Sequence, residues 1–282
     1  MTETVLSFAV LGDPVEHSVS PDMYRAAFEE LGIAARYGRQ RVNRPSLAAA
    51  MSALCDGGGG GNVTLPHKQA AAEIVDLPSE AVVRSGACNC FWADADAQIA
   101  GDNTDVDGLL AAVARLPRFE MSGARVLVLG AGGAGRAAVL ACERGGAESV
   151  WLRNRTSSRA EKVLSDFGTA RLDLRLADFK QLSEFDLIIN ATSLGLSSSD
   201  PLPLNLAEVR AGYALDLVYG RDADGTPWVQ SARAKGMVAA DGLDMLVQQA
   251  LLSVERWLGC EAPAACMKRA ALKALGRPWL AD

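Results

Sequence analysis

The chain has 282 residues, of which 49% are hydrophobic, and a formal net charge of −6 at pH 7. This length and apolar content suffice for a sizeable core, shared between two domains at about 100–200 residues each. The acidic balance argues against nucleic acid or an anionic membrane surface as the main partner, and the lack of a run of about 18 apolar residues argues against a membrane-spanning helix.

Cysteine and histidine usage bears on the compartment and on metal binding. The six cysteines are scattered, none of them in a C-x-x-C pair, and there are only two histidines. We therefore expect reduced thiols in a cytoplasmic protein and no metal site of the usual His and Cys spacing. The apolar run at 5–11 ends at Gly12-Asp13-Pro14 and has no cationic segment before it, so we expect no signal peptide.

From residue 1 to about 107, short strand-like runs alternate with helical patterns. Strands are predicted at 8–11, 36–42 and 61–64, and the helices that follow them at 21–31, 46–54 and 66–74. Such alternation predicts a mostly parallel sheet covered by helices. The runs 89–92 and 98–101, joined by a turn-rich segment, predict a hairpin added to this sheet, and a helix from 104 or 105 to 115 follows it.

A glycine-rich turn follows the apolar strand predicted at 125–129. Its sequence is Gly130-Ala131-Gly132-Gly133-Ala134-Gly135, and it opens a helical pattern that runs to residue 144. Glycines here allow a sharp bend, close approach of a pyrophosphate and packing of helix on strand, while the helix N-terminus offers N–H groups to phosphates. This order predicts a dinucleotide-binding site; the alternative is a tight connection that binds nothing.

The segment after the next predicted strand, 149–153, bears on the choice of cofactor. NAD sites place an acidic residue roughly 20 positions past the glycines, whereas an arginine accommodates the 2′-phosphate of NADP. In this chain no carboxylate stands at that strand end, which carries Asn154, Arg155, Thr156 and, one turn further, Arg159. Arginine forks suit a dianionic phosphate, so we predict NADP rather than NAD; the alternative is that the arginines are solvated surface charges.

The alternation of strands and helices continues to residue 240, and two helical stretches end the chain. Further strands are predicted at 171–176, 187–190, 214–217 and 237–240, and the last helices at 243–258 and 264–275. A chain that crosses from one domain to another and back gives two linkers and a cleft between the domains, where ligands commonly bind.

Two polar stretches follow strands in the first half of the chain. Lys68 lies at the start of a helix, behind a strand that carries Asn62 and Thr64 on one face, and Asp105 lies where another strand gives way to a helix. Carboxyl ends of parallel strands share one edge, the usual location of ligand sites. A lysine and an aspartate there could exchange a proton with a substrate hydroxyl while a nicotinamide takes hydride. Taken singly, a lysine at a helix start is usually solvated and an aspartate there usually caps the helix.

Several motifs, in order along nearly the whole chain, resemble those of the shikimate dehydrogenase family. The motifs are Gly12-Asp-Pro14-x-x-His17-Ser18-x-Ser20-Pro21, Asn62-Val-Thr64-x-Pro66-x-Lys68, Asn89, Gly101-Asp-Asn103-Thr104-Asp105, the turn from Gly130 to Gly135, Asn154-Arg155-Thr156-x-x-Arg159, Asn190-Ala-Thr192-Ser193 and Asp241-Gly242-Leu-x-Met245-Leu-Val-x-Gln249. The resemblance implies reversible, NADP-linked reduction of 3-dehydroshikimate to shikimate, a step of aromatic amino acid (chorismate) biosynthesis.

The family resemblance also implies a two-domain α/β fold. Residues 1–107 would form a mostly parallel α/β substrate domain, residues 108–240 an inserted Rossmann domain for NADP, and residues 241–282 helices that return to the substrate domain. We expect a monomer or a homodimer that binds a small-molecule substrate.

Site residues can be carried over from the family by position. Lys68 resembles the catalytic lysine and Asp105 its acidic partner. The substrate's hydrogen-bonding shell would be Ser18, Ser20, Asn62, Thr64, Asn89, Tyr219 and Gln249. Besides the glycine turn, the cofactor would contact Asn154, Arg155, Thr156, Arg159, Thr192, Leu217 and Gly242. No metal is implied.

Departures from the family pattern bear on the substrate rather than on the reaction. They are Tyr24 and Arg25 after the Ser-Pro motif, Cys88 and Cys90 on either side of Asn89, Val106 in place of a common glycine and Asp244 in place of a small residue. Dehydrogenases of quinate or of an amino analogue share this framework and sometimes prefer NAD, so they remain alternatives. A non-catalytic NADP-binding sensor is the alternative from another class, although it would have no use for Lys68 and Asp105.

Overall fold

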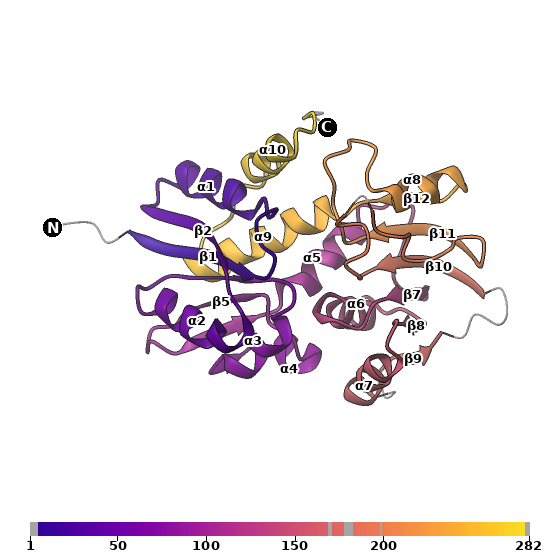
Figure 1. The fold of residues 1–282 in the computed structure, drawn as a ribbon, viewed down its shortest axis with the longest axis horizontal. Coiled ribbons are helices and arrows are strands. Elements are labelled where there is room, and N and C mark those ends of the chain that lie inside the picture. The colour runs from indigo at the N-terminus through magenta and orange to yellow at the C-terminus, as the bar shows by residue number, and fades with distance from the viewer. Residues whose placement is uncertain (1–4, 169–170, 178–182, 198, 280–282) are drawn as a thin grey trace. The chain divides into compact units, whose positions relative to one another are not determined.

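The computed structural model describes residues 5–168, 171–177, 183–197 and 199–279. The chain divides into two compact units, each with its own sheet (Figure 1). The N-terminal unit contains residues 1–104 and 247–282, and the Rossmann unit contains residues 105–246. The predicted α/β fold with two domains is confirmed.

The sheet of the N-terminal unit is mixed, with a single reversed strand. Its strands are β1 (Leu6–Gly12), β2 (Ala35–Arg41), β3 (Gly60–Val63), β4 (Leu77–Pro78), β5 (Cys90–Ala93) and β6 (Ile99–Asp102), in the order β2-β1-β3-β5-β6-β4. β5 runs antiparallel to β3 and to β6, and the other pairs are parallel. The predicted hairpin is therefore confirmed. Because β5 is reversed, it begins at the same edge at which β1, β3 and β6 end.

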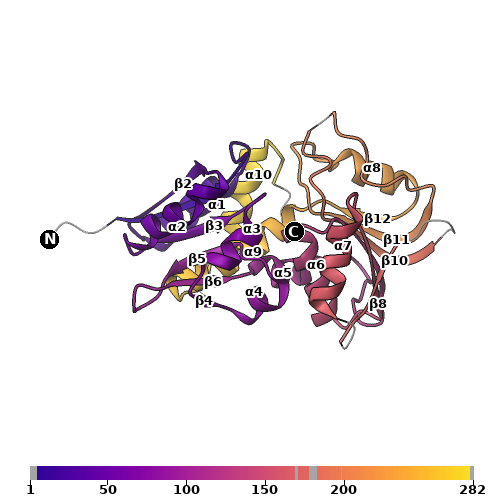
Figure 2. The same cartoon turned by 60° about the horizontal axis from the view of Figure 1, so that its bottom comes forward.

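Helices from both ends of the chain pack on this sheet. They are α1 (Ser20–Leu31), the 3-10 turn η1 (Arg44–Ser46), α2 (Leu47–Cys55), α3 (Lys68–Ile74), α4 (Glu80–Ser85), α9 (Leu243–Leu258) and α10 (Ala264–Leu275). α1 and α10 lie side by side (Figures 1 and 2). On α9, the indole N–H of Trp257 donates to the carbonyl of Phe91 in β5, which holds this late helix against the early sheet.

The sheet of the Rossmann unit is parallel throughout. Its strands are β7 (Arg125–Leu129), β8 (Ser149–Arg153), β9 (Asp173–Leu176), β10 (Ser183–Asn190), β11 (Val209–Asp216) and β12 (Val238–Ala240), in the order β12-β11-β10-β7-β8-β9. All five pairings are parallel. The order reverses between β7 and β10, so the carboxyl ends of these two strands form the switch point at which such sheets bind dinucleotides.

The helices of the Rossmann unit are α5 (Thr104–Val113), α6 (Gly133–Arg144), α7 (Ser157–Phe167) and α8 (Pro227–Ala234). Right-handed crossovers place α6 and α7 together on one face of the sheet and α8 on the other, and Figure 2 shows α6 beside α7. Residues 126–129 of β7 are all buried, as expected for a parallel strand covered on both faces. Within the described residues, every helix is too short or too polar to cross a membrane.

Short elements and half-exposed strand ends differ from the prediction. β4 has two residues and α4 six, too few to show a hydrophobic period. β10 and β11 begin four and five residues earlier than predicted, because their first halves carry exposed charged residues such as Glu184 and Arg210. These first halves lie far from the carboxyl edge, so the predicted site is unaffected.

Candidate functional site

The predicted site residues fall into two groups, one in each unit. In the N-terminal unit they gather where β1, β3 and β6 end and β5 begins, because the reversed β5 brings Asn89 to the same edge as its neighbours' carboxyl ends. This group contains Ser18, Ser20, Asn62, Thr64, Lys68, Asn89 and Gln249. In the Rossmann unit the group comprises Asp105 at the start of α5, the glycine turn, the segment 154–159, Thr192, Leu217, Tyr219 and Gly242.

Asn89 is the centre of a buried hydrogen-bond network. The residue is 2% exposed, and its Oδ1 accepts the backbone N–H of Thr104 at 2.8 Å. Its Nδ2 donates to Thr104 Oγ1 at 3.0 Å and to Gln249 Oε1 at 3.4 Å. Thr104 is the first residue of α5, so these bonds fix the turn that presents the buried carboxylate of Asp105.

Asn62 is bonded to the protein at both ends of its amide. Its Oδ1 accepts from the Tyr37 hydroxyl at 2.8 Å, while its Nδ2 donates to the Asn89 carbonyl and to Ser253 Oγ, each at 3.1 Å. Asn62 therefore joins β3 to α9, and its bond to the Asn89 carbonyl fixes the backbone at Asn89. Ser253 and Tyr37 were not among the predicted site residues; Ser253 stands four positions after Gln249, a helical spacing that places both on one face of α9.

Lys68 is the first residue of α3, and its backbone is fixed next to Asn89. Its carbonyl accepts the N–H of Cys88 at 2.8 Å. The preceding residue, His67, is buried and its Nε2 lies 2.7 Å from the Val42 carbonyl. The lysine side chain itself is half-buried.

The loops after β1 and β3 are bonded to each other and to β2. The N–H of Asp13 donates to the Leu65 carbonyl at 3.0 Å, and the guanidinium of Arg39 donates twice to the Ser18 carbonyl, at 2.8 and 2.6 Å. Ser18 Oγ accepts the N–H of Ser20 at 3.3 Å. The two serines and Thr64 are thus carried by loops whose backbone is fixed.

Three of the residues that depart from the family pattern, Cys88, Cys90 and Tyr24, are buried in the core of the N-terminal unit next to this network. Cys88 and Cys90 are fully buried, and burial raises the pKa of the Cys88 thiol to about 12 and that of Cys90 well above its usual value. Both thiols are therefore protonated at neutral pH. Tyr24 is also fully buried and stacks on Tyr37, with 4.3 Å between the ring centroids. Tyr24 thus packs on the tyrosine that donates to Asn62, and the two buried cysteines flank Asn89 in the sequence.

The glycine turn of the Rossmann unit has a backbone that depends on glycine at two positions, 130 and 135. Gly130 has a φ of +107°, and its N–H donates to the Arg153 carbonyl at 2.7 Å. A Cβ on Gly135 would lie 2.0 Å from the Gly130 carbonyl oxygen, so only glycine allows this close packing of α6 on the turn. Gly132 is exposed, and a Cβ there would meet nothing within 4 Å, which leaves open space before the first N–H groups of α6.

Replacing Gly135 with alanine should lower the free energy of unfolding by about 1–3 kcal/mol, because the new methyl group overlaps a backbone oxygen that cannot move alone. Urea unfolding measures this change. Gly132→Ala is the matched control: it adds the same methyl group to open space and should change stability by less than about 0.5 kcal/mol. Equal destabilisation by both substitutions would contradict the packing argument.

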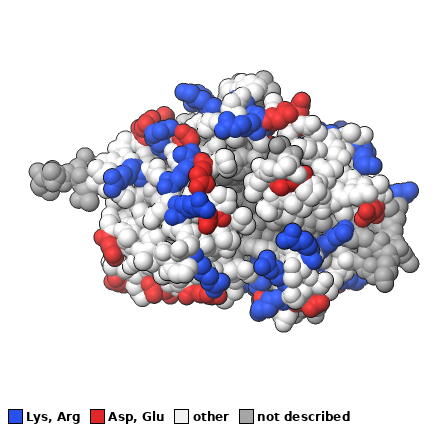
Figure 3. Space-filling view, viewed as in Figure 1, with Lys and Arg blue, Asp and Glu red and all other residues white. Residues whose placement is uncertain are grey.

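The segment after β8 presents two arginines beside the glycine turn. Asn154 Oδ1 accepts the Ala131 N–H at 3.1 Å and its Nδ2 donates to the Thr156 carbonyl at 2.9 Å, so the turn and the segment are bonded together. Arg155 and Arg159 are exposed, and within the described residues neither guanidinium forms an ion pair. Basic side chains gather on the face that carries α6 and α7 (Figure 3). This donor set fits the 2′-phosphate of NADP.

Four other residues of this group lie on the loops after β10, β11 and β12, at the same edge: Thr192, Leu217, Tyr219 and Gly242. The backbone N–H and Oγ1 of Thr192 both donate to Asn190 Oδ1, at 3.1 and 2.7 Å. The N–H of Leu217 donates to the Asn190 carbonyl at 2.9 Å. A Cβ on Gly242 would lie 2.3 Å from the Leu217 carbonyl oxygen, so glycine is required for this approach. The loops after β10, β11 and β12 are therefore packed together.

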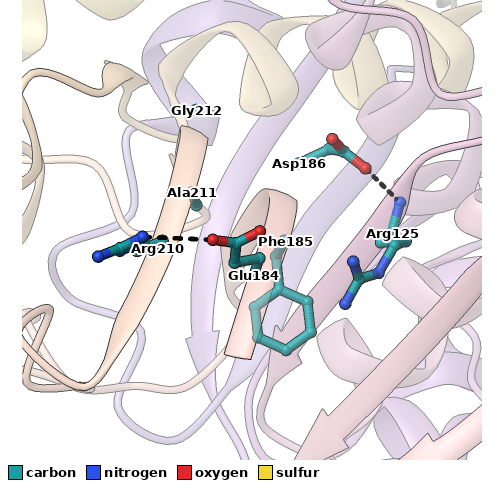
Figure 4. A pocket seen from close by; sticks show the side chains of 7 residues that line it. All are labelled: Arg125, Glu184, Phe185, Asp186, Arg210, Ala211 and Gly212. Atoms are coloured by element: carbon teal, nitrogen blue, oxygen red, sulfur yellow. Dashed lines mark hydrogen bonds and ion pairs between the residues drawn. The ribbon is translucent and has the colours of Figure 1, made fainter. Parts of the chain in front are cut away.

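A cavity of about 290 Å³ lies at the opposite edge of the same sheet (Figure 4). It is lined by Arg125, Glu184, Phe185, Asp186, Arg210, Ala211 and Gly212. Arg210 pairs with Glu184 at 3.4 Å, and the Arg125 N–H donates to Asp186 Oδ2 at 2.7 Å. The cavity lies at the amino ends of the strands, away from the usual ligand edge.

Comparison with known proteins places these features in one family. Residues 10–91 match a model described as the shikimate dehydrogenase substrate binding domain. Residues 112–198 match one described as shikimate / quinate 5-dehydrogenase, and residues 242–272 match the shikimate 5′-dehydrogenase C-terminal domain.

Individual relatives match over almost the full length of the chain. Shikimate dehydrogenase (NADP(+)) of Methanothrix thermoacetophila is 37% identical, with 96% of this chain and 98% of that protein covered. The structure of shikimate 5-dehydrogenase from Thermus thermophilus in complex with NADP(H) and shikimate has a TM-score of 0.84 and 36% identity, covering 95% of this chain and 99% of that chain. The 5-ketofructose reductase of a Gluconobacter strain has a TM-score of 0.80 and 27% identity, covering 97% and 99%. The chain therefore belongs to the shikimate dehydrogenase family.

Proposed function

We propose that this protein is an NADP-dependent oxidoreductase that interconverts 3-dehydroshikimate and shikimate, a step of aromatic amino acid biosynthesis through chorismate. The observation that carries the proposal is that each of the two sheets has polar or glycine-rich site residues at one edge, in a chain of the shikimate dehydrogenase family. One edge holds Lys68 beside the Asn89 network, and the other holds a glycine turn bonded to a segment with two arginines. The relative from Thermus thermophilus was solved with both NADP(H) and shikimate.

NADP(H) would be held along the carboxyl edge of the Rossmann sheet and would supply or take the hydride. The pyrophosphate would lie on the turn from Gly130 to Gly135 and the N-terminus of α6, where Gly132 leaves open space. Arg155 and Arg159 would hold the 2′-phosphate with Asn154 and Thr156. Thr192, Leu217 and Gly242 would border the nicotinamide.

The substrate is a small polyhydroxy carboxylate and needs donors and acceptors for each oxygen. Ser18 and Ser20 would take the carboxylate, while Thr64, Asn89, Tyr219 and Gln249 would bond the hydroxyl groups. Asn62 would belong to the same set; its Nδ2 donates to the Asn89 carbonyl, and its Oδ1, which accepts from Tyr37, would also be offered to the substrate. Residues whose backbone is fixed before binding lose less conformational entropy when the substrate arrives.

Lys68 and Asp105 would carry the proton chemistry. In the direction of reduction, hydride adds to the carbonyl carbon while the Lys68 ammonium stabilises the negative charge that develops on the oxygen and gives it a proton. Oxidation of shikimate reverses both transfers. Asp105 would accept a hydrogen bond from the reacting hydroxyl.

The proposal extends to domains, assembly and compartment. Residues 1–107 would form the substrate domain, 108–240 the NADP domain, and 241–282 the returning helices. We propose a monomer or a homodimer in the cytoplasm; all six cysteines are free thiols, as in proteins of a reducing compartment.

The decisive experiment follows nicotinamide reduction with shikimate or quinate, each with NADP⁺ or NAD⁺. We expect the highest kcat/KM for shikimate with NADP⁺. A higher kcat/KM for quinate would favour a quinate dehydrogenase instead. The 5-ketofructose reductase shows that proteins of this fold are not all named as shikimate dehydrogenases. Tight NADP⁺ binding without turnover on any substrate would favour a sensor.

A further inference from the structure

Two fully buried polar side chains end adjacent strands of the Rossmann sheet. Asn190 is the last residue of β10 and Asp216 the last of β11, and the two are paired in register. Both are 0% exposed. Asn190 Nδ2 donates to Asp216 Oδ1 at 2.8 Å, so an amide and a carboxylate are joined inside the carboxyl edge of the sheet.

The Asp216 carboxylate accepts bonds from three separate segments. Besides Asn190, its Oδ1 accepts the Val218 N–H at 3.0 Å, and its Oδ2 accepts the Thr226 hydroxyl at 2.6 Å. Thr226 Oγ1 in turn accepts the Val229 N–H and caps α8. One carboxylate thus connects the end of β10, the loop after β11 and the start of α8.

The side chain of Asn190 also fixes the loop after β10 by hydrogen bonds. Its Oδ1 accepts both the N–H and the hydroxyl of Thr192, and its Nδ2 also donates to the Leu194 carbonyl at 3.2 Å. The backbone carbonyl of Asn190 accepts the Leu217 N–H. Thr192 and Leu217, which the proposed function sets beside the nicotinamide, are therefore both oriented by the Asn190–Asp216 pair.

An uncharged side chain at position 216 would avoid the free-energy penalty of burying a carboxylate, but it could not accept a bond from each of these donors. Burial raises the pKa of Asp216 to about 6, against the hydrogen bonds from Thr226, Val218 and Asn190, which lower it. The negative charge of Asp241, in the loop after β12, raises the pKa further. The carboxylate therefore changes its protonation state just below neutral pH.

We propose that Asp216, acting through Asn190 and the N–H of Val218, is a positioning residue that sets the loops after β10 and β11 for the nicotinamide half of NADP(H). The inference rests on the proposed function. In this proposal Asp216 acts without touching cofactor or substrate. Only the binding of the nicotinamide half depends on the Asn190–Asp216 pair; the binding of the 2′-phosphate half by Arg155 and Arg159 does not.

The test compares Asp216→Asn with the unchanged protein, measuring by calorimetry the affinity for NADP⁺ and for adenosine 2′,5′-bisphosphate, which lacks the nicotinamide half. Asparagine keeps the shape but cannot accept from every donor, so NADP⁺ affinity should fall about tenfold or more, while the fragment's affinity changes less than about twofold. Asp222→Asn, an exposed aspartate in the loop before α8, is the control and should alter neither affinity. Equal losses for both ligands, or no loss, would overturn the proposal.

A pH series on the unchanged protein gives a second test that needs no variant. The 5′-phosphate of adenosine 2′,5′-bisphosphate titrates near pH 6 and has no counterpart in NADP⁺, so this series uses adenosine 2′-monophosphate as the fragment. The 2′-phosphate titrates near pH 6 in both ligands, and its effect cancels in the ratio of their affinities. Because a protonated Asp216 has fewer acceptor sites, the ratio of NADP⁺ affinity to fragment affinity should fall as the pH is lowered from 8 through about 6 to 5. A ratio that stays constant would contradict the inference. Failure of the proposed function itself would show differently, as a protein without turnover or without preference for NADP⁺ over the fragment.

Discussion

Lys68→Ala should lower kcat for shikimate oxidation by about 10²–10⁴-fold while the protein remains folded, because the proposed proton donor and acceptor is lost. The fold should persist since the lysine side chain is half-buried at a helix start, and the neighbouring bond from Cys88 uses its backbone carbonyl. Stopped-flow or steady-state turnover with NADP⁺ measures the loss, and urea unfolding checks stability.

Lys68→Arg is the matched control for charge. Arginine keeps the positive charge but does not release its proton in a protein, so it can stabilise the oxygen without exchanging a proton. We expect the arginine variant to retain substrate binding and to remain slow in turnover. Unchanged kcat in Lys68→Ala would refute the mechanism, and full activity in Lys68→Arg would show that charge alone suffices.

Local features of the fold could be predicted because they depend on residues close together in the sequence. β7, the glycine turn and α6 lie within residues 125–144, and the apolar run, the glycines and the helical period each indicate the element that forms. β4 and α4 could not be predicted in this way because two strand residues and six helical residues are too few to show a pattern that repeats. Their positions depend on β6 and the loops around it.

The candidate site shows the same division. Strand alternation predicts that Asn62 and Thr64 share a face, and the family motif adds that both bear on the substrate. The pattern does not reveal that Asn62 is bonded to Tyr37 and Ser253, because those partners are 25 and 191 residues away. Asp216 escapes notice for a similar reason: its burial results from the pairing of β10 with β11 and from the cap of α8.

The choice of cofactor gives the second large effect. Arg155→Ala should weaken NADP⁺ binding about 10- to 100-fold, the size expected for a lost charge-assisted hydrogen bond, and should change NAD⁺ binding less than about threefold. The reason is that Arg155 is exposed in the segment that Asn154 bonds to the glycine turn, and within the described residues its guanidinium has no carboxylate partner to be freed by the change.

Arg153→Ala is the control for a general loss of positive charge at this end of β8. Arg153 precedes the segment by one residue and lies 3.9 Å from Glu208, so its removal should affect both cofactors little. The test measures calorimetric affinities for NADP⁺ and NAD⁺ with the unchanged protein, Arg155→Ala and Arg153→Ala. The salt concentration is kept constant, because screening by salt weakens exposed charge pairs. A second substitution, Arg159→Ala, should bring the NADP⁺ affinity of Arg155→Ala close to that for NAD⁺. Equal losses for the two cofactors in Arg155→Ala would mean that this arginine contacts a group common to both, such as the pyrophosphate, and that the 2′-phosphate is held elsewhere.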